Sequence, residues 1–151
     1  AIRLVKDGEV TTLATAATSK IVMPIHMMPA EDGSYLIADA GIQKIVRWSP
    51  GDEGTVLAPE TEMAMPHGVD DDANGNVYVA EIRGNQITQL STGNAEKQFA
   101  GTWDAGSEPE LLDKPAGVLV NDGYLWIADL NNHRISVVSL ESLTTITETG
   151  E

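Results

Sequence analysis

The residue in this chain best suited to chemistry is His67, in the segment Met-Pro-His-Gly-Val. A neutral imidazole can bind a metal ion or transfer a proton near neutral pH. His26 also lies shortly after a proline, and Asp70 begins a run of three acids that two asparagines soon follow. Calcium requires several oxygen ligands of this kind, although the spacing is not that of an EF-hand loop. A solvated turn is the alternative for the acids, and a hydrogen bond to a neighbouring backbone carbonyl is the alternative for His67.

Another set of acids recurs along the chain. Asp39, Glu81 and Asp129 each follow an alanine, at separations of 42 and 48 residues. A carboxylate at the end of a strand accepts hydrogen bonds from turn N–H groups and pairs with a nearby cation, here Lys44 or Arg134. Because these acids recur in every copy, we interpret them as structural, together with His133 in the same turn.

The acids belong to three copies of one longer pattern. The copies are "YLIADAGIQKIVRW", "NVYVAEIRGNQITQL" and "YLWIADLNNHRISVV". In each copy an isoleucine follows the alanine by seven residues, and a proline precedes the alanine by 13 or 14. A repeat of 40–50 residues carried on short strands is typical of a β-propeller.

The turn signals divide each copy into four strands. The sequence therefore predicts an all-β fold of four-stranded antiparallel blades at residues 24–62, 66–104 and 115–149, in a single segment spanning 1–151. Residues 1–19 match only the outer strand pair of a blade. The second strand of each blade is apolar at nearly every position, which predicts that both of its faces are covered. The total is about 3.5 blades of a six- or seven-bladed ring.

The third copy carries a family resemblance. "YLWIADLNNHRISVVSLE" resembles an NHL repeat, and residues 132–135, Asn-His-Arg-Ile, match the segment that names the family. The resemblance covers most of residues 20–151 and implies an NHL-type propeller. It says little about function, because NHL propellers include binding modules, scaffolds and a few enzymes.

The chain is also similar to the propeller lyases that cleave peptidyl-hydroxyglycine, in which histidines after the proline of three blades hold one zinc ion. That resemblance makes His67 the candidate metal ligand. The equivalent positions in the other blades are Ile25 and Ala116, and His26 lies one residue further on, where a strand side chain points to the other face. We therefore expect no metal at His67 in this chain alone. Zinc and calcium are the cofactors considered, and neither is favoured.

Charge and composition limit the partners. The 151 residues include 23 Asp and Glu against 9 Lys and Arg, a net charge of −14. Because the basic residues are scattered, nucleic acid and anionic membranes are poor partners. No apolar run is long enough to span a bilayer, and cysteine is absent, which excludes disulfides and thiol chemistry. The acidity suits a secreted or periplasmic setting.

The function that needs only the fold is a binding or assembly module, with His67, His26 and Asp70 as candidate contacts in the central tunnel. Fourteen strands do not close a propeller, so we expect a homodimer or a complementary propeller chain to complete the ring. The alternative function is part of a metal-dependent lyase or hydrolase that uses His67. We assign no catalytic residue and favour a protein that is not an enzyme, because the chain places too few polar groups near the tunnel.

Overall fold

The computed structural model describes residues 1–91, 96–141 and 146–149. Over these ranges the chain consists of β-strands and one short 3₁₀ helix, η1 (Leu130–Asn132). The prediction of an all-β fold is confirmed. None of the described residues forms a helix that is long and apolar enough to cross a membrane.

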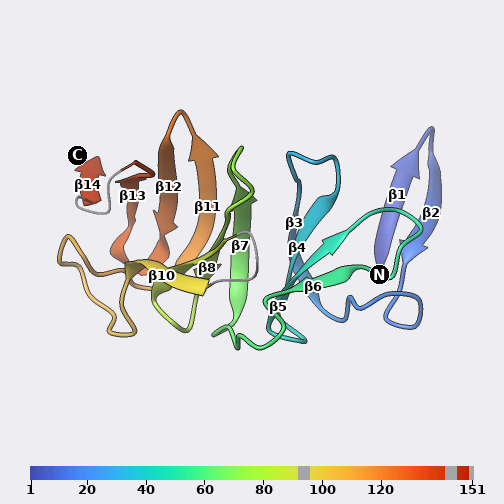
Figure 1. The fold of residues 1–151 in the computed structure, drawn as a ribbon, viewed down its shortest axis with the longest axis horizontal. Helices are drawn as coiled ribbons and strands as arrows, with labels where there is room; N and C mark the ends of the chain where they lie inside the picture. Colours follow the sequence, from blue (N-terminus) through green and yellow to red (C-terminus); the bar gives the residue numbers. More distant parts are fainter. Residues whose placement is uncertain (92–95, 142–145, 150–151) are drawn as a thin grey trace.

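The strands form three four-stranded antiparallel sheets and one two-stranded sheet (Figure 1). In each large sheet the strands lie in chain order, as in the blade of a propeller. The first blade contains β3 (Pro24–Pro29), β4 (Tyr35–Asp39), β5 (Lys44–Trp48) and β6 (Thr55–Leu57). The second contains β7 (Pro66–Asp71), β8 (Val77–Glu81), β9 (Gln86–Leu90) and β10 (Glu96–Gly101). The third contains β11 (Pro115–Asn121), β12 (Tyr124–Asp129), β13 (Arg134–Ser139) and β14 (Ile146–Thr149).

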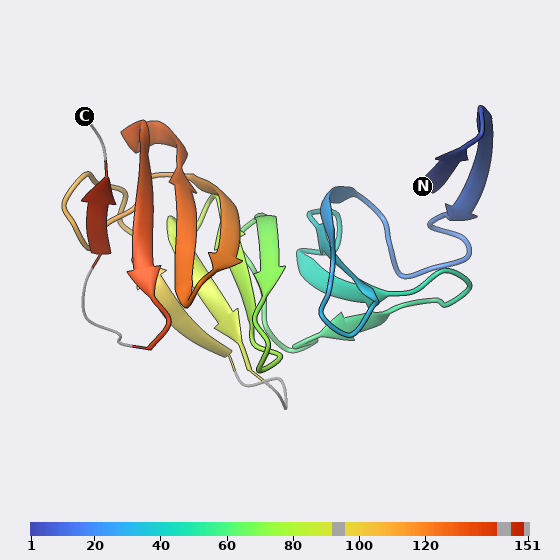
Figure 2. The same cartoon turned by 90° about the horizontal axis from the view of Figure 1, so that it is seen from above.

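The two-stranded sheet is the N-terminal pair β1 (Ile2–Lys6) and β2 (Glu9–Ala14). Ile2 and Ala14 are buried in one cluster with Ile37, Val46 and Trp48 of the first blade. The pair therefore covers part of that blade's free face, as the outer half of a preceding blade would. Figures 1 and 2 show the pair at one end of an open arc and the third blade at the other.

The blades repeat one another in detail. The repeated alanine of each second strand lies opposite the repeated isoleucine of the third strand in all three blades. The turn between those strands has a left-handed residue at one fixed position, which Gln43, Asn85 and His133 occupy with φ values of 55°, 49° and 53°. Asparagine, found in the second blade, tolerates that conformation better than most residues do. Because the same conformation recurs in all three blades, we attribute the turn, including His133, to local backbone geometry rather than to ligand binding.

Two apolar clusters join the blades. Leu36, Ala38 and Ile45 of the first blade pack against Val69 and Val79 of the second. The equivalent residues of the second blade, Tyr78, Ala80 and Ile87, pack in the same way against the third. Burial between stacked sheets is the main contribution that holds the arc together.

The three tryptophans differ in burial. Trp48 is buried in the first blade, at 2% exposure. Trp103 follows β10 in a loop and is 63% exposed, and Trp126 is 37% exposed on the third blade. Among the described residues, the third blade therefore leaves one face uncovered, and the covering of both faces of every second strand stays a prediction about the completed ring.

Candidate functional site

The first strands of the blades form the candidate site. β7 lies between β3 and β11, so its residues contact both neighbouring blades (Figure 1). The approach to β11 is very close: a Cβ atom on Gly68 would lie 2.7 Å from the Cα of Gly117 and 2.9 Å from the carbonyl oxygen of Ala116. Only glycine fits at residue 68 without a shift of the backbone.

His67 begins this contact. Its Nδ1 atom lies 2.8 Å from the carbonyl oxygen of Ala116, on the neighbouring blade, and the residue is half-buried. A carbonyl oxygen only accepts hydrogen bonds, so Nδ1 is the donor, and in the neutral tautomer that carries its proton on Nδ1 the Nε2 atom keeps a lone pair. The ring therefore joins two blades through one nitrogen and offers the other as an acceptor or metal ligand.

His26 lies on β3 at a different register position. It faces Ala38, just as Gly117 faces Ala128 in the third blade, so it is not the equivalent of His67. Its side chain is exposed, and its charge acts on Asp70 across the contact between blades. The structure thus places His26 near Asp70, whereas the polar contact of His67 is to Ala116.

The three consecutive acids have three separate partners. Asp70 accepts a 2.7 Å hydrogen bond through Oδ2 from the backbone N–H of Val120, in the next blade. Asp71 accepts one from the backbone N–H of Glu31, in the preceding blade. Successive side chains of a strand point to opposite faces, so adjacent acids reach opposite neighbours.

Asp72 instead organises the turn after β7. Its Oδ1 accepts from the backbone N–H groups of Asn74 and Asn76, each at 2.9 Å. Its Oδ2 accepts from the Tyr78 hydroxyl at 3.1 Å. These contacts account for all three acids through hydrogen bonds within the protein.

Burial perturbs several of these groups. It raises the pKa of Asp70, and the hydrogen bonds from Val120 and Asp71 oppose the shift. Burial also raises the pKa of Asp71, where the N–H of Glu31 acts in the opposite direction. The pKa of Tyr78 is raised by burial and then by the neighbouring Asp72 carboxylate. Burial thus disfavours the charged form of Asp70 and Asp71, and the cross-blade hydrogen bonds act in the opposite direction.

The surroundings are acidic. A cavity of about 650 Å³ adjoins the turn after β7, and its lining includes Glu31, Asp71, Asp72, Asp122 and Glu141. Such a lining repels phosphate groups and attracts cations. In the part of the chain that the structure describes, no three His, Cys, Asp or Glu side chains are grouped closely enough to hold a metal ion.

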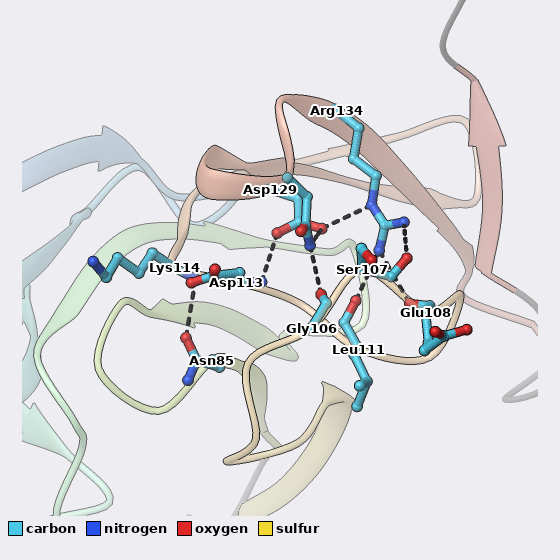
Figure 3. Close-up of polar contacts among 10 residues, drawn as sticks. Asn85, Gly106, Ser107, Glu108, Leu111, Asp113, Lys114, Asp129 and Arg134 are labelled. Atoms are coloured by element: carbon cyan, nitrogen blue, oxygen red, sulfur yellow. Dashed lines mark hydrogen bonds and ion pairs between the residues drawn. The ribbon is translucent and has the colours of Figure 1, made fainter.

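The repeated acids are buried and hold together their own blades. Asp39 accepts from the backbone N–H groups of Val22 and Met23, and Glu81 accepts from that of Ala64. Asp129 accepts from the N–H of Asp113 at 2.8 Å (Figure 3). Each acid therefore fixes the segment that leads into the first strand of its blade.

The cations near these acids differ between blades. Arg134 Nε lies 2.8 Å from Asp129 Oδ2, and its other nitrogens donate to backbone carbonyls of the loop between β10 and β11, including that of Leu111 (Figure 3). The predicted pairing with Arg134 is therefore confirmed. Lys44 instead donates to the carbonyl oxygen of Thr61, so its predicted pairing with Asp39 is wrong.

Sequence reasoning missed the close approach of the glycines and the cross-blade bonds of Asp70 and Asp71. The signal for the glycines was present, because both "PHGV" and "PAGV" carry glycine at the second residue after the proline. No local sequence pattern indicates that Asp70 and Asp71 accept hydrogen bonds from different blades, because their partners lie about 50 and 40 residues away in the chain.

The fold has known relatives in structure. The chain superposes on a Bacteroides thetaiotaomicron protein of unknown function with a TM-score of 0.72 at 17% identity, covering 89% of this chain and 40% of that one. It matches a catalytically inactive virginiamycin B lyase from Staphylococcus aureus, solved with quinupristin, with a TM-score of 0.70 at 18% identity, covering 97% and 47%. A streptogramin B lyase gives a TM-score of 0.63 at 18% identity, covering 81% and 38%.

These similarities show a β-propeller type of fold. No family model matches the chain, and no curated protein matches it either. The chain spans less than half the length of the solved structures cited above.

Proposed function

We propose that this chain is an NHL-type segment of a β-propeller, which acts as a binding and assembly module after another copy or a complementary chain completes its ring. The observation that carries this proposal is the open arc, whose two ends leave apolar strand faces exposed. The greater length of the similar solved propellers supports it, because this chain covers only 40% and 47% of two of them.

Within the completed ring, the proposed ligand contacts are His67, His26 and Asp70. All lie on first strands, and His26 is exposed beside the charge of Asp70. The acidic cavity nearby favours a cationic ligand over a phosphate.

Sedimentation velocity of the purified chain tests the assembly proposal. We expect a species heavier than the 16.1 kDa of one chain, in an equilibrium that depends on protein concentration. A folded species that stays at the mass of one chain over the whole accessible concentration range would overturn it.

A second candidate function is a role in a metal-dependent lyase or hydrolase. It is favoured by the lone pair that the bond to Ala116 leaves on Nε2 of His67, and by the lyases among the similar structures. The remaining ligands would come from blades outside this chain. Zinc analysis of the assembled protein separates the two functions: our leading proposal expects no stoichiometric zinc. Zinc that is lost in His67→Ala but kept in His26→Ala would establish the second function instead.

A further inference from the structure

The third blade presents an uncovered face, which we call the third-blade face and define by Gly117, Leu119, Trp126, Ala128 and Ile135. Leu119 is 54% exposed, Trp126 37% and Ile135 43%. They border a shallow groove of about 410 Å³. Contiguous apolar surface of this kind is typical of an interaction site.

The same positions are buried in the other two blades. Tyr78 holds the position of Trp126 and is 2% exposed, and Ile87 holds the position of Ile135 and is fully buried. Leu36 and Ile45 of the first blade are also fully buried. The third-blade face therefore continues a series in which each earlier member is covered by the next blade.

Gly117 adds a geometric argument. At its equivalent, Gly68, the backbone of β11 lies so close that a Cβ atom would clash with it. Among the described residues, a Cβ atom on Gly117 would meet only the Cβ of Ala128, at 3.6 Å, which is an ordinary contact. The third blade thus keeps glycine where an approaching backbone needs it, although no described residue occupies the space.

We propose that the third-blade face binds β3 of a second copy of this chain, an inference that rests on the proposed ring assembly. The opposite end of the arc exposes Ile25 at 37% and Met27 at 42%, both on β3. Met27 faces Ile37 in its blade just as Val118 faces Ile127, and Val118 packs toward the second blade. β3 therefore offers the next copy the same side that β11 offers β7.

Two such contacts, related by a two-fold axis, would close the ring with two copies of the chain. Each copy has one third-blade face and one exposed β3, so two copies satisfy both around a two-fold axis, the commonest symmetry of soluble oligomers. Each copy supplies three full blades, so the ring has six, with the β1–β2 pairs at the two seams. Val5 and Val10, directly opposite each other in that pair, are 69% and 59% exposed.

Charge sets the expected salt dependence. Each copy carries −14, so two copies repel one another while their apolar surfaces attract. At 0.1 M, salt largely screens the repulsion between exposed charges more than about 10 Å apart, and added sodium chloride should therefore strengthen the dimer. Dissociation of the dimer by salt would contradict an apolar contact between copies.

Disulfide trapping tests the geometry, because the chain has no cysteine of its own. Leu119→Cys and Met27→Cys would be purified separately, mixed and oxidised. We expect a cross-linked dimer that contains one of each variant. The matched control replaces Leu119→Cys with Trp103→Cys, in an exposed loop away from the face, and should give no more cross-linking than random collision.

Sedimentation of Gly117→Ala completes the test, because this variant leaves packing inside the chain intact. We expect dimerisation about ten- to a hundredfold weaker than in the wild type, whereas Trp103→Ala should dimerise normally. A wild-type oligomer that neither forms the cross-link nor weakens in Gly117→Ala would overturn this interface while leaving the proposed assembly intact. A monomeric wild-type chain would overturn both, and would mean that other residues cover the face.

Discussion

The second and third blades are nearly the same sheet in two environments. Their second strands are equally apolar, yet Tyr78 is 2% exposed and Trp126 is 37% exposed at equivalent positions. The difference that accounts for this is the neighbour: the third blade packs on the second, whereas no described strand packs on the far side of the third. An apolar strand sequence thus indicates that a face is suited to pack against another sheet. Whether the face is buried depends on the presence of a neighbouring blade.

The largest expected effect tests this comparison directly. Tyr78→Ala should lower the free energy of unfolding by about 3–5 kcal/mol, because it leaves a cavity between blades. That loss should not depend on protein concentration. The loss from Trp126→Ala should instead be small in dilute solution and grow with concentration, since this side chain is covered only when copies associate. Urea unfolding at two protein concentrations measures both, and equal concentration dependence would break the comparison.

A second pair of variants compares the buried acids. Arg134→Ala removes the charge partner of the fully buried Asp129, and should cost about 3–5 kcal/mol. Gln86→Ala removes the amide that donates to Glu81 at the equivalent position, and should cost about 1–3 kcal/mol. Urea unfolding gives both values. If Arg134→Ala were the milder change, the loop between β10 and β11 would not depend on this ion pair.

The two glycines sharpen the comparison at the level of the backbone. Gly68→Ala should cost about 1–3 kcal/mol, because the new Cβ meets the backbone of β11. In dilute solution Gly117→Ala should change stability by less than about 0.5 kcal/mol, like an ordinary surface substitution. Thermal unfolding of both variants at low concentration measures the difference. Equal costs would show that residue 117 is already constrained within the single chain.

The smallest expected effect concerns pH. Because the folded-state pKa of Asp70 is raised, the folded chain binds that proton more tightly than the unfolded chain does. Its contribution is therefore fully present below about pH 3.9, the pKa of an unfolded aspartate, and is lost as pH rises through the folded pKa. Asp70→Asn keeps an acceptor for the N–H of Val120 and should lose less stability than the wild type between about pH 4 and 7.

Asp32→Asn is the matched control for that prediction. The hydrogen bonds of Ser34 lower the pKa of Asp32, so its contribution is present above the unfolded pKa and is lost as pH falls. The two variants should therefore change the pH dependence in opposite directions. Urea midpoints across this pH range measure the effect, and a shift of the same sign in both would contradict the burial argument for Asp70.

The candidate site was only partly predictable. The difference between His67 and His26 follows from a one-residue offset, because the side-chain period of a strand is two. The bond from His67 to Ala116, and the separate partners of Asp70 and Asp71, depend on how far neighbouring blades rotate and approach, and that packing has no signature within one repeat.

The sequence by itself determined the strands, their order within each blade and the equivalence of the three copies. Those features depend on local alternation, turn residues and a repeating alanine and acid, all of which act over a few residues. Only the tertiary structure shows which apolar faces are buried and which glycine has no room for a Cβ atom, namely Gly68. Burial is a property of two surfaces in contact, and Trp126 and Gly117 carry the pattern of a blade interface although no described residue packs there as a neighbouring blade would.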